Sequence, residues 1–247
     1  MKHQRGIGLS EILVSIFLSS FIVIILMQHY LVVKKQYHHL QATLEQGIDL
    51  QLVIELLRNS SRKAGFTPCL SIDDLVTVDR RDRSNPLTAI DVSTHHNRLL
   101  AINRMSDRFD TVLQVESPTQ LLMTALAPRH QGDSILIADC YHAEVQQVQG
   151  VVHVGSNQRI ILNLPLAFDY HEPIYVGEWL EERYFIRQDK NGKGSLFYQH
   201  HHSEELTTAV HSLSAHIAYE TGQRVIVVQL GLEDTETIVV ETRVRAL

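Results

Sequence analysis

The sequence predicts an α+β protein in which one long N-terminal helix packs on a C-terminal antiparallel β-sheet domain. No Asp, Glu, Lys or Arg occurs from Ile12 to Val33. A leucine or isoleucine then recurs every fourth residue from Leu40 to Leu56, which is the spacing of one helix face. After Val112 the chain consists of short alternating or β-branched runs, the pattern of strands. A helix followed by a series of strands is the element order of an α+β domain.

The composition is that of a globular protein with one exceptional segment. The chain has 247 residues, of which 44% are hydrophobic and 20% are charged. These values exclude a disordered chain and a polytopic membrane protein. The formal net charge is -6 with the 15 histidines neutral, so no overall basic surface attracts nucleic acid. We therefore expect no direct nucleic-acid partner, and we expect no cofactor.

The first predicted element is a helix over residues 7–63. Its segment 12–33, about 22 residues, is long enough to cross ~30 Å of hydrocarbon, so we expect a single transmembrane segment in contact with membrane lipid. No proline occurs before Pro68, and the helix continues past the apolar run as an amphipathic half. We expect the four-residue stripe of this half to pack on a domain, and Gly65 and Pro68 to end the helix.

Residues 64–247 are predicted to form a β-rich domain. The polar stretch from Asp73 to Arg108 is expected to form loops with short elements. Hairpin turns are predicted at 189–194 and at 233–235. The predicted strands are Ser134–Asp139, Val151–Val154, Arg159–Leu162, Leu180–Gln188, Ser195–Gln199, Arg224–Leu232 and Thr237–Arg245.

The two cysteines, Cys69 and Cys140, both follow the apolar segment. If that part of the chain is exported, they lie in a compartment where a disulfide forms. The bond would close a loop of about 70 residues and contribute on the order of 4 kcal/mol in the chain-entropy treatment. The alternative is a pair of buried thiols in a cytosolic protein.

Glu11 is the feature that a plain membrane anchor leaves unexplained. A carboxylate deep in an apolar span costs roughly 2.5–3.5 kcal/mol, and less near an end. A secretory signal has a basic start, which Lys2 and Arg5 supply, but it has a shorter apolar stretch and a small-residue cleavage site. Here the run is longer and no such site closes it. Charge does not decide the orientation, because Lys34 and Lys35 balance the two cations before the run.

The run Gly6-Ile7-Gly8-Leu9-Ser10-Glu11, followed by an apolar helix, resembles the signal of type IV prepilins. The resemblance implies that a prepilin peptidase removes a leader, residues 1–6, by cutting between Gly6 and Ile7. It implies that the new amine of Ile7 is then methylated. It also implies that Glu11 pairs with the terminal ammonium of a neighbouring subunit and sets the register between helices, since a buried acid is tolerated when paired. Ile7 stands where the family usually has Phe, and Ser10 replaces the usual apolar residue.

Three later segments narrow the resemblance to PilW-type minor pilins. They are Arg58–Cys69 (RNSSRKAGFTPC), Asp133–Val148 (DSILIADCYHAEVQQV) and Trp179–Arg187 (WLEERYFIR). That family also carries one cysteine after the helix end and a second in a strand. The resemblance implies a pilin-like fold and a minor subunit that takes part in initiating type IV pilus assembly, incorporated at a tip or priming complex.

The same resemblance implies partners and a location. The partners are prepilin peptidase, other minor pilins, the major pilin and the inner-membrane pilus assembly platform. The location is the inner membrane, with a single pass and the C-terminal domain in the periplasm, and then the pilus fibre on the cell surface. Two alternatives stay open at this point. A J-type pseudopilin of a type II secretion system would share the signal, helix and sheet. A membrane-anchored periplasmic enzyme or sensor would keep an uncleaved N-terminus.

Motifs of known chemistry are missing from the sequence. There is no G-x-S-x-G, Walker loop, C-x-x-C or H-E-x-x-H, so we expect no catalytic residues and no enzyme activity. Histidines gather at 38–39, 95–96 and 200–202. His200 and His202 could share a face, with His211 or His216 nearby, but adjacent strand residues point to opposite faces. We interpret these histidines as parts of solvated loops and predict no metal site.

Overall fold

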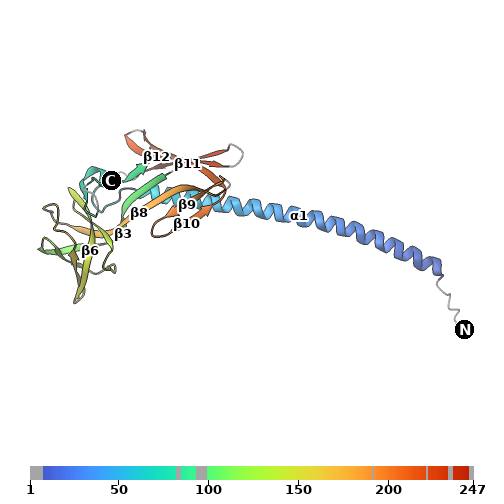
Figure 1. Ribbon diagram of the computed structural model, residues 1–247, viewed down its shortest axis with the longest axis horizontal. Coiled ribbons are helices and arrows are strands. Elements are labelled where there is room, and N and C mark those ends of the chain that lie inside the picture. Colours follow the sequence, from blue (N-terminus) through green and yellow to red (C-terminus); the bar gives the residue numbers. More distant parts are fainter. Residues whose placement is uncertain are drawn as a thin grey trace. The chain divides into compact units, whose positions relative to one another are not determined.

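The structure is a computed structural model that describes residues 8–81, 85–92, 99–190, 192–220, 222–232 and 236–244. The chain divides into two compact units, Met1–Asp49 and Leu50–Leu247. The first unit contains most of helix α1 (Leu9–Arg62), and the second contains the end of α1 and all the described strands (Figure 1). One long helix whose end packs on mainly antiparallel strands confirms the α+β class.

The second unit begins with a short 3-10 helix, η1 (Ile72–Asp74), and continues with strands only. The strands are β1 (Val76–Asp79), β2 (Ile90–Val92), β3 (Leu99–Ser117), β4 (Gln120–Thr124), β5 (Ser134–Ala138), β6 (His142–Val154), β7 (Asn157–Leu162), β8 (Tyr175–Gln188), β9 (Gly194–Gln199), β10 (Ser203–Thr207), β11 (Val210–Glu220), β12 (Gln223–Leu232) and β13 (Thr237–Arg243).

The largest sheet closes on itself. Its order is β10-β9-β8-β5-β6-β7-β4-β3-β2, with β1 added by parallel pairing to β6. Because β3 also pairs with β8, the six strands β3, β4, β7, β6, β5 and β8 form a ring without free edges. Each of the six contributes to one buried cluster, formed by Val112, Leu121, Met123, Ile135, Ile137, Val148, Ile160, Leu162, Ile174 and Val176. These side chains are the core of a small barrel.

The end of α1 packs on a different core. Val53 and Leu57 are buried, as is Ala64 just beyond the helix. They belong to a cluster that also contains residues of β3, β8 and the separate three-stranded sheet β11-β12-β13. Burying a leucine such as Leu57 contributes roughly 1.5–3 kcal/mol. The last turns of the helix are therefore part of the folded domain.

A buried polar network fastens the same end of α1 to the sheet. The Ser60 hydroxyl donates to the Glu182 carboxylate and lies 2.8 Å from the Tyr184 hydroxyl. Arg104 on β3 donates from Nη2 to Glu182 Oε1 over 2.8 Å. Glu182 is only 5% exposed, so these partners compensate the loss of water around its charge. The network specifies which helix face meets β3 and β8.

The stripe predicted to pack on the domain is not the packing face, which is a correction. Leu40, Leu44 and Ile48 are exposed, and Leu52 is 64% exposed. Only Leu56 is partly buried against the core. Four residues turn an α-helix by about 400°, so a strict four-residue repeat drifts around the axis by about 40° at each step. The packed face lies on the other side of the helix, over positions 53, 57, 60 and 61.

The segment Asp73–Arg108, predicted to form loops, contains more strand than expected. It holds β1 and β2, and the 19-residue strand β3 begins inside it at Leu99. Two of the charged side chains that made this segment resemble a loop have partners in the fold, since Arg104 pairs with Glu182 and Asp107 pairs with Lys63. Strands β4, β10 and β11 were also missed, and β6 begins at His142 rather than at Val151. Strand β8 begins at Tyr175 rather than at Leu180, and the other predicted strands match described strands with small shifts of their ends.

The predicted turns are placed as follows. Strands β8 and β9 pair as a hairpin, and the Asp189 N–H donates to the Lys193 carbonyl over 2.9 Å. Strands β12 and β13 also pair antiparallel, while their connection, 233–235, lies outside the described residues. After the helix, Gly65 has φ +71°, and a Cβ there would lie 2.6 Å from Ser71 Oγ. Glycine is therefore required at this turn.

Candidate functional site

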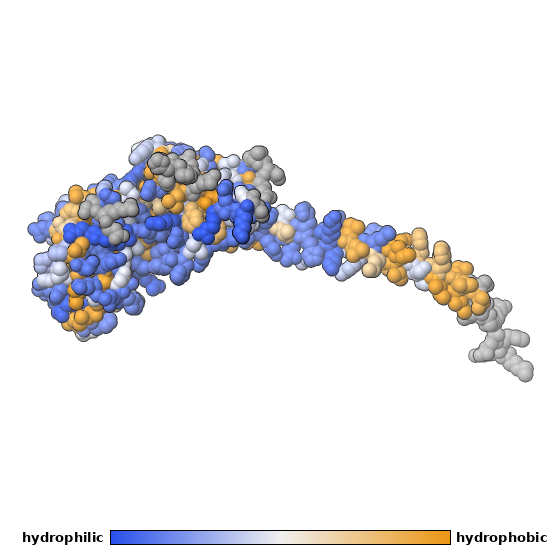
Figure 2. Space-filling model, viewed as in Figure 1, coloured by the Kyte–Doolittle hydropathy of each residue, from blue (hydrophilic) through white to orange (hydrophobic). Residues whose placement is uncertain are grey.

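The N-terminal half of α1 is apolar on every side. Each large apolar side chain from Leu9 to Val33 has at least 41% of its surface exposed. Figure 2 shows this part of the helix as mainly orange, with smaller pale and blue patches between the apolar side chains. A helix with one buried face would instead show an apolar stripe. The helix is long and apolar enough to span a membrane, which is compatible with a single-pass anchor.

Two serines within this half are satisfied by the helix itself. Ser19 Oγ donates to the Ile16 carbonyl over 2.9 Å, and Ser20 Oγ donates to the Phe17 carbonyl over 2.8 Å. Polar groups in hydrocarbon need such internal partners, because no water is available there. These two serines therefore do not prevent the segment from entering a bilayer.

Glu11 lies in the first turn of α1, where it stabilises the helix end. The Gly8 N–H donates to Glu11 Oε2 over 3.2 Å, and the Glu11 N–H donates to the Gly8 carbonyl over 3.0 Å. A carboxylate at a helix N-terminus is favoured by about 0.3–1 kcal/mol through the helix dipole. Within the described part of the chain, Glu11 has no cationic partner. The predicted cleavage site Gly6–Ile7, and with it the methylation site Ile7, lies outside the described residues.

The two cysteines are joined in the structure. Cys69 and Cys140 form a disulfide with a Cα–Cα separation of 5.2 Å and a sequence separation of 71. The bond connects the segment after α1 to the turn between β5 and β6. It therefore ties the helix-bearing end of the domain to the barrel strands.

Asp139 organises the turn beside the disulfide. Its carboxylate accepts the backbone N–H groups of Tyr141 (2.7 Å), His142 (2.5 Å) and His171 (2.8 Å). Burial raises the pKa of Asp139, but the three N–H donors together lower it by more, so the pKa lies below its usual value. The imidazoles of His142 and His171 approach the same carboxylate at 3.5 and 3.9 Å. This carboxylate is already committed to backbone donors.

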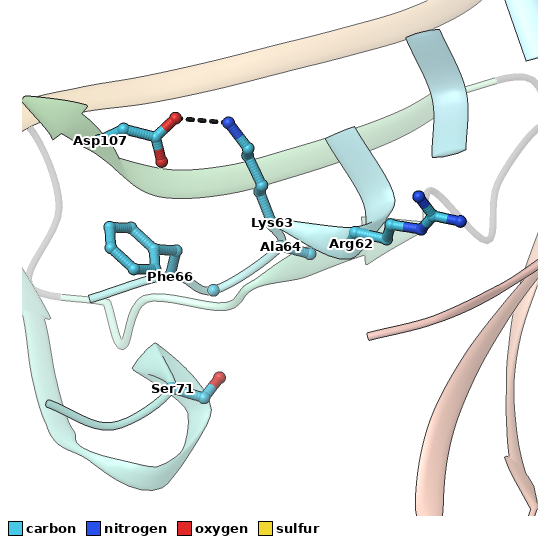
Figure 3. A pocket seen from close by; sticks show the side chains of 7 residues that line it. Arg62, Lys63, Ala64, Phe66, Ser71 and Asp107 are labelled. Atoms are coloured by element: carbon cyan, nitrogen blue, oxygen red, sulfur yellow. Dashed lines mark hydrogen bonds and ion pairs between the residues drawn. The ribbon is translucent and has the colours of Figure 1, made fainter. Parts of the chain in front are cut away.

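A small hollow lies where α1 ends (Figure 3). It has a volume of about 60 Å³ and is lined by Arg62, Lys63, Ala64, Gly65, Phe66, Ser71 and Asp107. Lys63 and Asp107 pair across its rim, as Figure 3 shows. Ligand pockets usually enclose about 300–1,000 Å³, so this hollow is too small for a typical organic substrate.

A larger open groove, of about 550 Å³, runs beside Arg81. Its main charges pair with one another. Arg81 Nη2 lies 2.7 Å from Asp79 Oδ2 and 2.5 Å from Glu181 Oε1. The Trp179 indole N–H also donates to Glu181, over 2.8 Å. Burial raises the pKa of Glu181, but Arg81 and Trp179 lower it, and the pKa lies below its usual value. These charges hold strand β1 and the barrel together.

The structure confirms the predicted loop position of His200 and His201, but it places His38 and His39 in helix α1 rather than in a loop. His200 and His201 lie in the turn between β9 and β10, not in a strand, and their ring centroids are 3.9 Å apart. They converge with Glu178 of β8, a residue that the sequence analysis did not select. His211 instead places Nδ1 2.7 Å from the Gly194 carbonyl. The pair 95–96 lies outside the described residues.

Comparisons of the chain with models of protein families, with curated proteins and with solved structures found no match in any of the three.

Proposed function

We propose that this protein is a membrane-anchored minor pilin of the PilW type, which takes part in initiating type IV pilus assembly and is incorporated in the pilus. One observation carries the proposal. A single helix of 54 residues begins with an acid in its first turn, continues as an apolar cylinder, and ends inside an antiparallel domain. Such a chain can be stored in a membrane and then transferred to a bundle of like helices, because both environments accept an apolar cylinder.

Glu11 supports this proposal through its position. The carboxylate is exposed and engaged by one backbone N–H of its own chain, so it can accept a further donor. In a fibre, the methylated ammonium of Ile7 of a neighbouring subunit would be that donor. Pairing offsets the cost of burying the acid and gives each helix a defined axial register. A plain anchor gains nothing comparable from an acid at this point.

The exported location is supported by the second unit. A disulfide between Cys69 and Cys140 persists in an oxidising compartment such as the periplasm. With the domain in the periplasm, the residues before the apolar run would face the cytoplasm. A prepilin peptidase of the inner membrane could then reach the bond between Gly6 and Ile7.

The test is the mass of the N-terminal peptide after co-expression with a prepilin peptidase. We expect a peptide that begins at Ile7 and is heavier by one methyl group. Gly6→Val should abolish cleavage, whereas the matched variant Gly8→Ala should still be cleaved. An intact Met1 in the unaltered chain would contradict the proposal and favour a simple anchor. Co-purification with type II secretion components, rather than with pilins, would favour the pseudopilin alternative.

A further inference from the structure

Strand β8 has a gap along one edge. Strand β3 runs along the other edge, from Tyr175 to Phe185 of β8. The remaining edge is therefore shared, by β5 at residues 175–178 and by β9 at residues 183–188. Positions 179–182 face neither of these two strands. A hollow of about 260 Å³ lies at this gap, between the start of β5 and the end of β9.

Three potential metal ligands converge at this gap. They are Glu178 at the last β8 position paired with β5, and His200 and His201 in the turn that follows β9. One ligand atom from each lies within 4.8 Å of the others, and His201 Nε2 is 3.7 Å from Glu178 Oε1. The turn brings two neighbouring imidazoles to one side, which a regular strand would prevent.

The ligand atoms are not committed elsewhere among the described residues. His200 Nδ1 is buried and has no hydrogen-bond partner. A buried imidazole nitrogen without a partner loses about 1–3 kcal/mol of solvation, which a bound cation would restore. Among the described residues, the ion-pair contact of Glu178 is with the exposed His201. This sets the group apart from the one at Asp139, whose carboxylate already accepts three backbone N–H groups.

The charges around the hollow favour a cation. Glu178, Asp133 and Glu181 all line it, and Arg81 is the basic side chain among the lining residues. Arg81 is held by Asp79 and Glu181, so its charge is balanced. A cation at Glu178 would therefore meet an excess of carboxylate.

We propose that Glu178, His200 and His201 form a binding site for a divalent transition metal of the Zn²⁺ class. Two imidazoles and one carboxylate suit Zn²⁺, Cu²⁺ or Ni²⁺, whereas Ca²⁺ and Mg²⁺ prefer all-oxygen sites. Bonds of about 2.0–2.2 Å place tetrahedral ligands about 3.4 Å apart, so modest side-chain rotations complete the site. A water molecule would fill the remaining position. The ion joins the β9–β10 turn to β8 and closes the gap, a role separate from pilus assembly.

The experiment is titration of the full-length, detergent-solubilised, chelator-treated protein with Zn²⁺ alone, followed by calorimetry. We expect one tightest site per chain, and a loss of affinity of at least about tenfold in His200→Asn, His201→Asn and Glu178→Gln. His202→Asn, in the same turn but outside the group, and His171→Asn, from the Asp139 group, should leave this site unchanged. Thermal unfolding without metal checks that each variant is folded. Glu178→Gln, on a regular strand, is the variant least expected to disturb the turn.

A second measurement uses the unaltered protein and so does not depend on the variants. Zn²⁺ affinity should fall as the solution becomes more acidic, because protons compete with the metal for the same ligand atoms. Co²⁺ in place of Zn²⁺ should give the intense visible absorption of a four-coordinate site. Full affinity in Glu178→Gln, or preferred binding of Ca²⁺ over Zn²⁺, would overturn the proposal. Neither result would bear on cleavage at Gly6, so the two proposals fail separately.

Discussion

The two halves of α1 differ in what decides their environment. From 12 to 33 the helix is apolar on all sides and no large apolar side chain is buried. From 53 to 61 one face is buried, and that face combines Val53 and Leu57 with the Ser60 hydroxyl. The first half is defined by composition and tolerates any rotation about its axis. In the second half, the position of a residue around the helix axis decides whether it is buried. Single substitutions on the buried face should therefore change the free energy of unfolding strongly.

The largest expected effect concerns the domain only. Replacing Cys69 and Cys140 together by alanine should lower the free energy of unfolding by about 4 kcal/mol, because the reduced chain gains the entropy of a long open loop. Urea unfolding measures this, and reduction of the unaltered protein with a thiol should give the same loss. Helicity of the membrane half in detergent should not change. Equal stability of the oxidised protein and the double variant would contradict the assigned role of the bond.

Leu57→Ala comes next and tests the comparison within one helix. Leu57 is 0% exposed, and its truncation should cost about 3 kcal/mol through lost burial and a residual cavity. Leu52→Ala is the matched control, because Leu52 is 64% exposed and the change should stay within about 0.5 kcal/mol. Both free energies come from the same urea series. Similar values for the two variants would mean that the packing face is assigned wrongly.

Asp139→Asn should cost about 2 kcal/mol at pH 7. Three backbone N–H groups donate to the two oxygens of the carboxylate, whereas the amide has only one acceptor oxygen. The folded-state pKa of Asp139 is lowered. Its stabilising contribution is therefore present above the unfolded value, about 3.9, and is lost as the pH falls through the folded value. The difference between the urea midpoints of the two proteins should be smaller at pH 3 than at pH 7. A constant difference would exclude the ionised carboxylate as the cause.

The element types of this fold could be read from sequence where each signal is local. The apolar run, the helix stop at Gly65 and the hairpin around Asp189 depend on residues close in the chain. Strand β3 could not be predicted, because charged residues such as Arg104 and Asp107 in it are paired with partners distant in the sequence. Arg104 lies in a polar stretch of sequence, yet 78 residues later Glu182 neutralises it in the core. Only the folded chain shows that such a charge belongs inside.

The candidate sites follow the same division. Glu11 is conspicuous in sequence because its neighbours are apolar, and no tertiary contact is needed to find it. The group of Glu178, His200 and His201 depends on two strands sharing one edge of β8, which no local pattern encodes. The sequence shows the neighbouring histidines and their loop position, but it does not show that Glu178 lies beside them. The packing face of the helix was predicted wrongly for a similar reason. The stripe from Leu40 to Leu56 is a local pattern, and it does not show which face of the helix a distant domain covers.

The smallest effect on folding is expected at Glu11, where the comparison between the halves becomes a test of mechanism. Glu11→Gln keeps an oxygen that accepts the Gly8 N–H but removes the charge, and Glu11→Ala removes both. Either change should cost the isolated helix at most about 1 kcal/mol. If the acid pairs with the ammonium of a neighbouring subunit, both variants should reach the membrane normally and both should be missing from purified pili, as measured by immunoblot. If Glu11 only caps its own helix, Glu11→Gln should be incorporated nearly as well as the unaltered chain. The glutamine variant therefore separates a charge that assembles subunits from an oxygen that ends a helix.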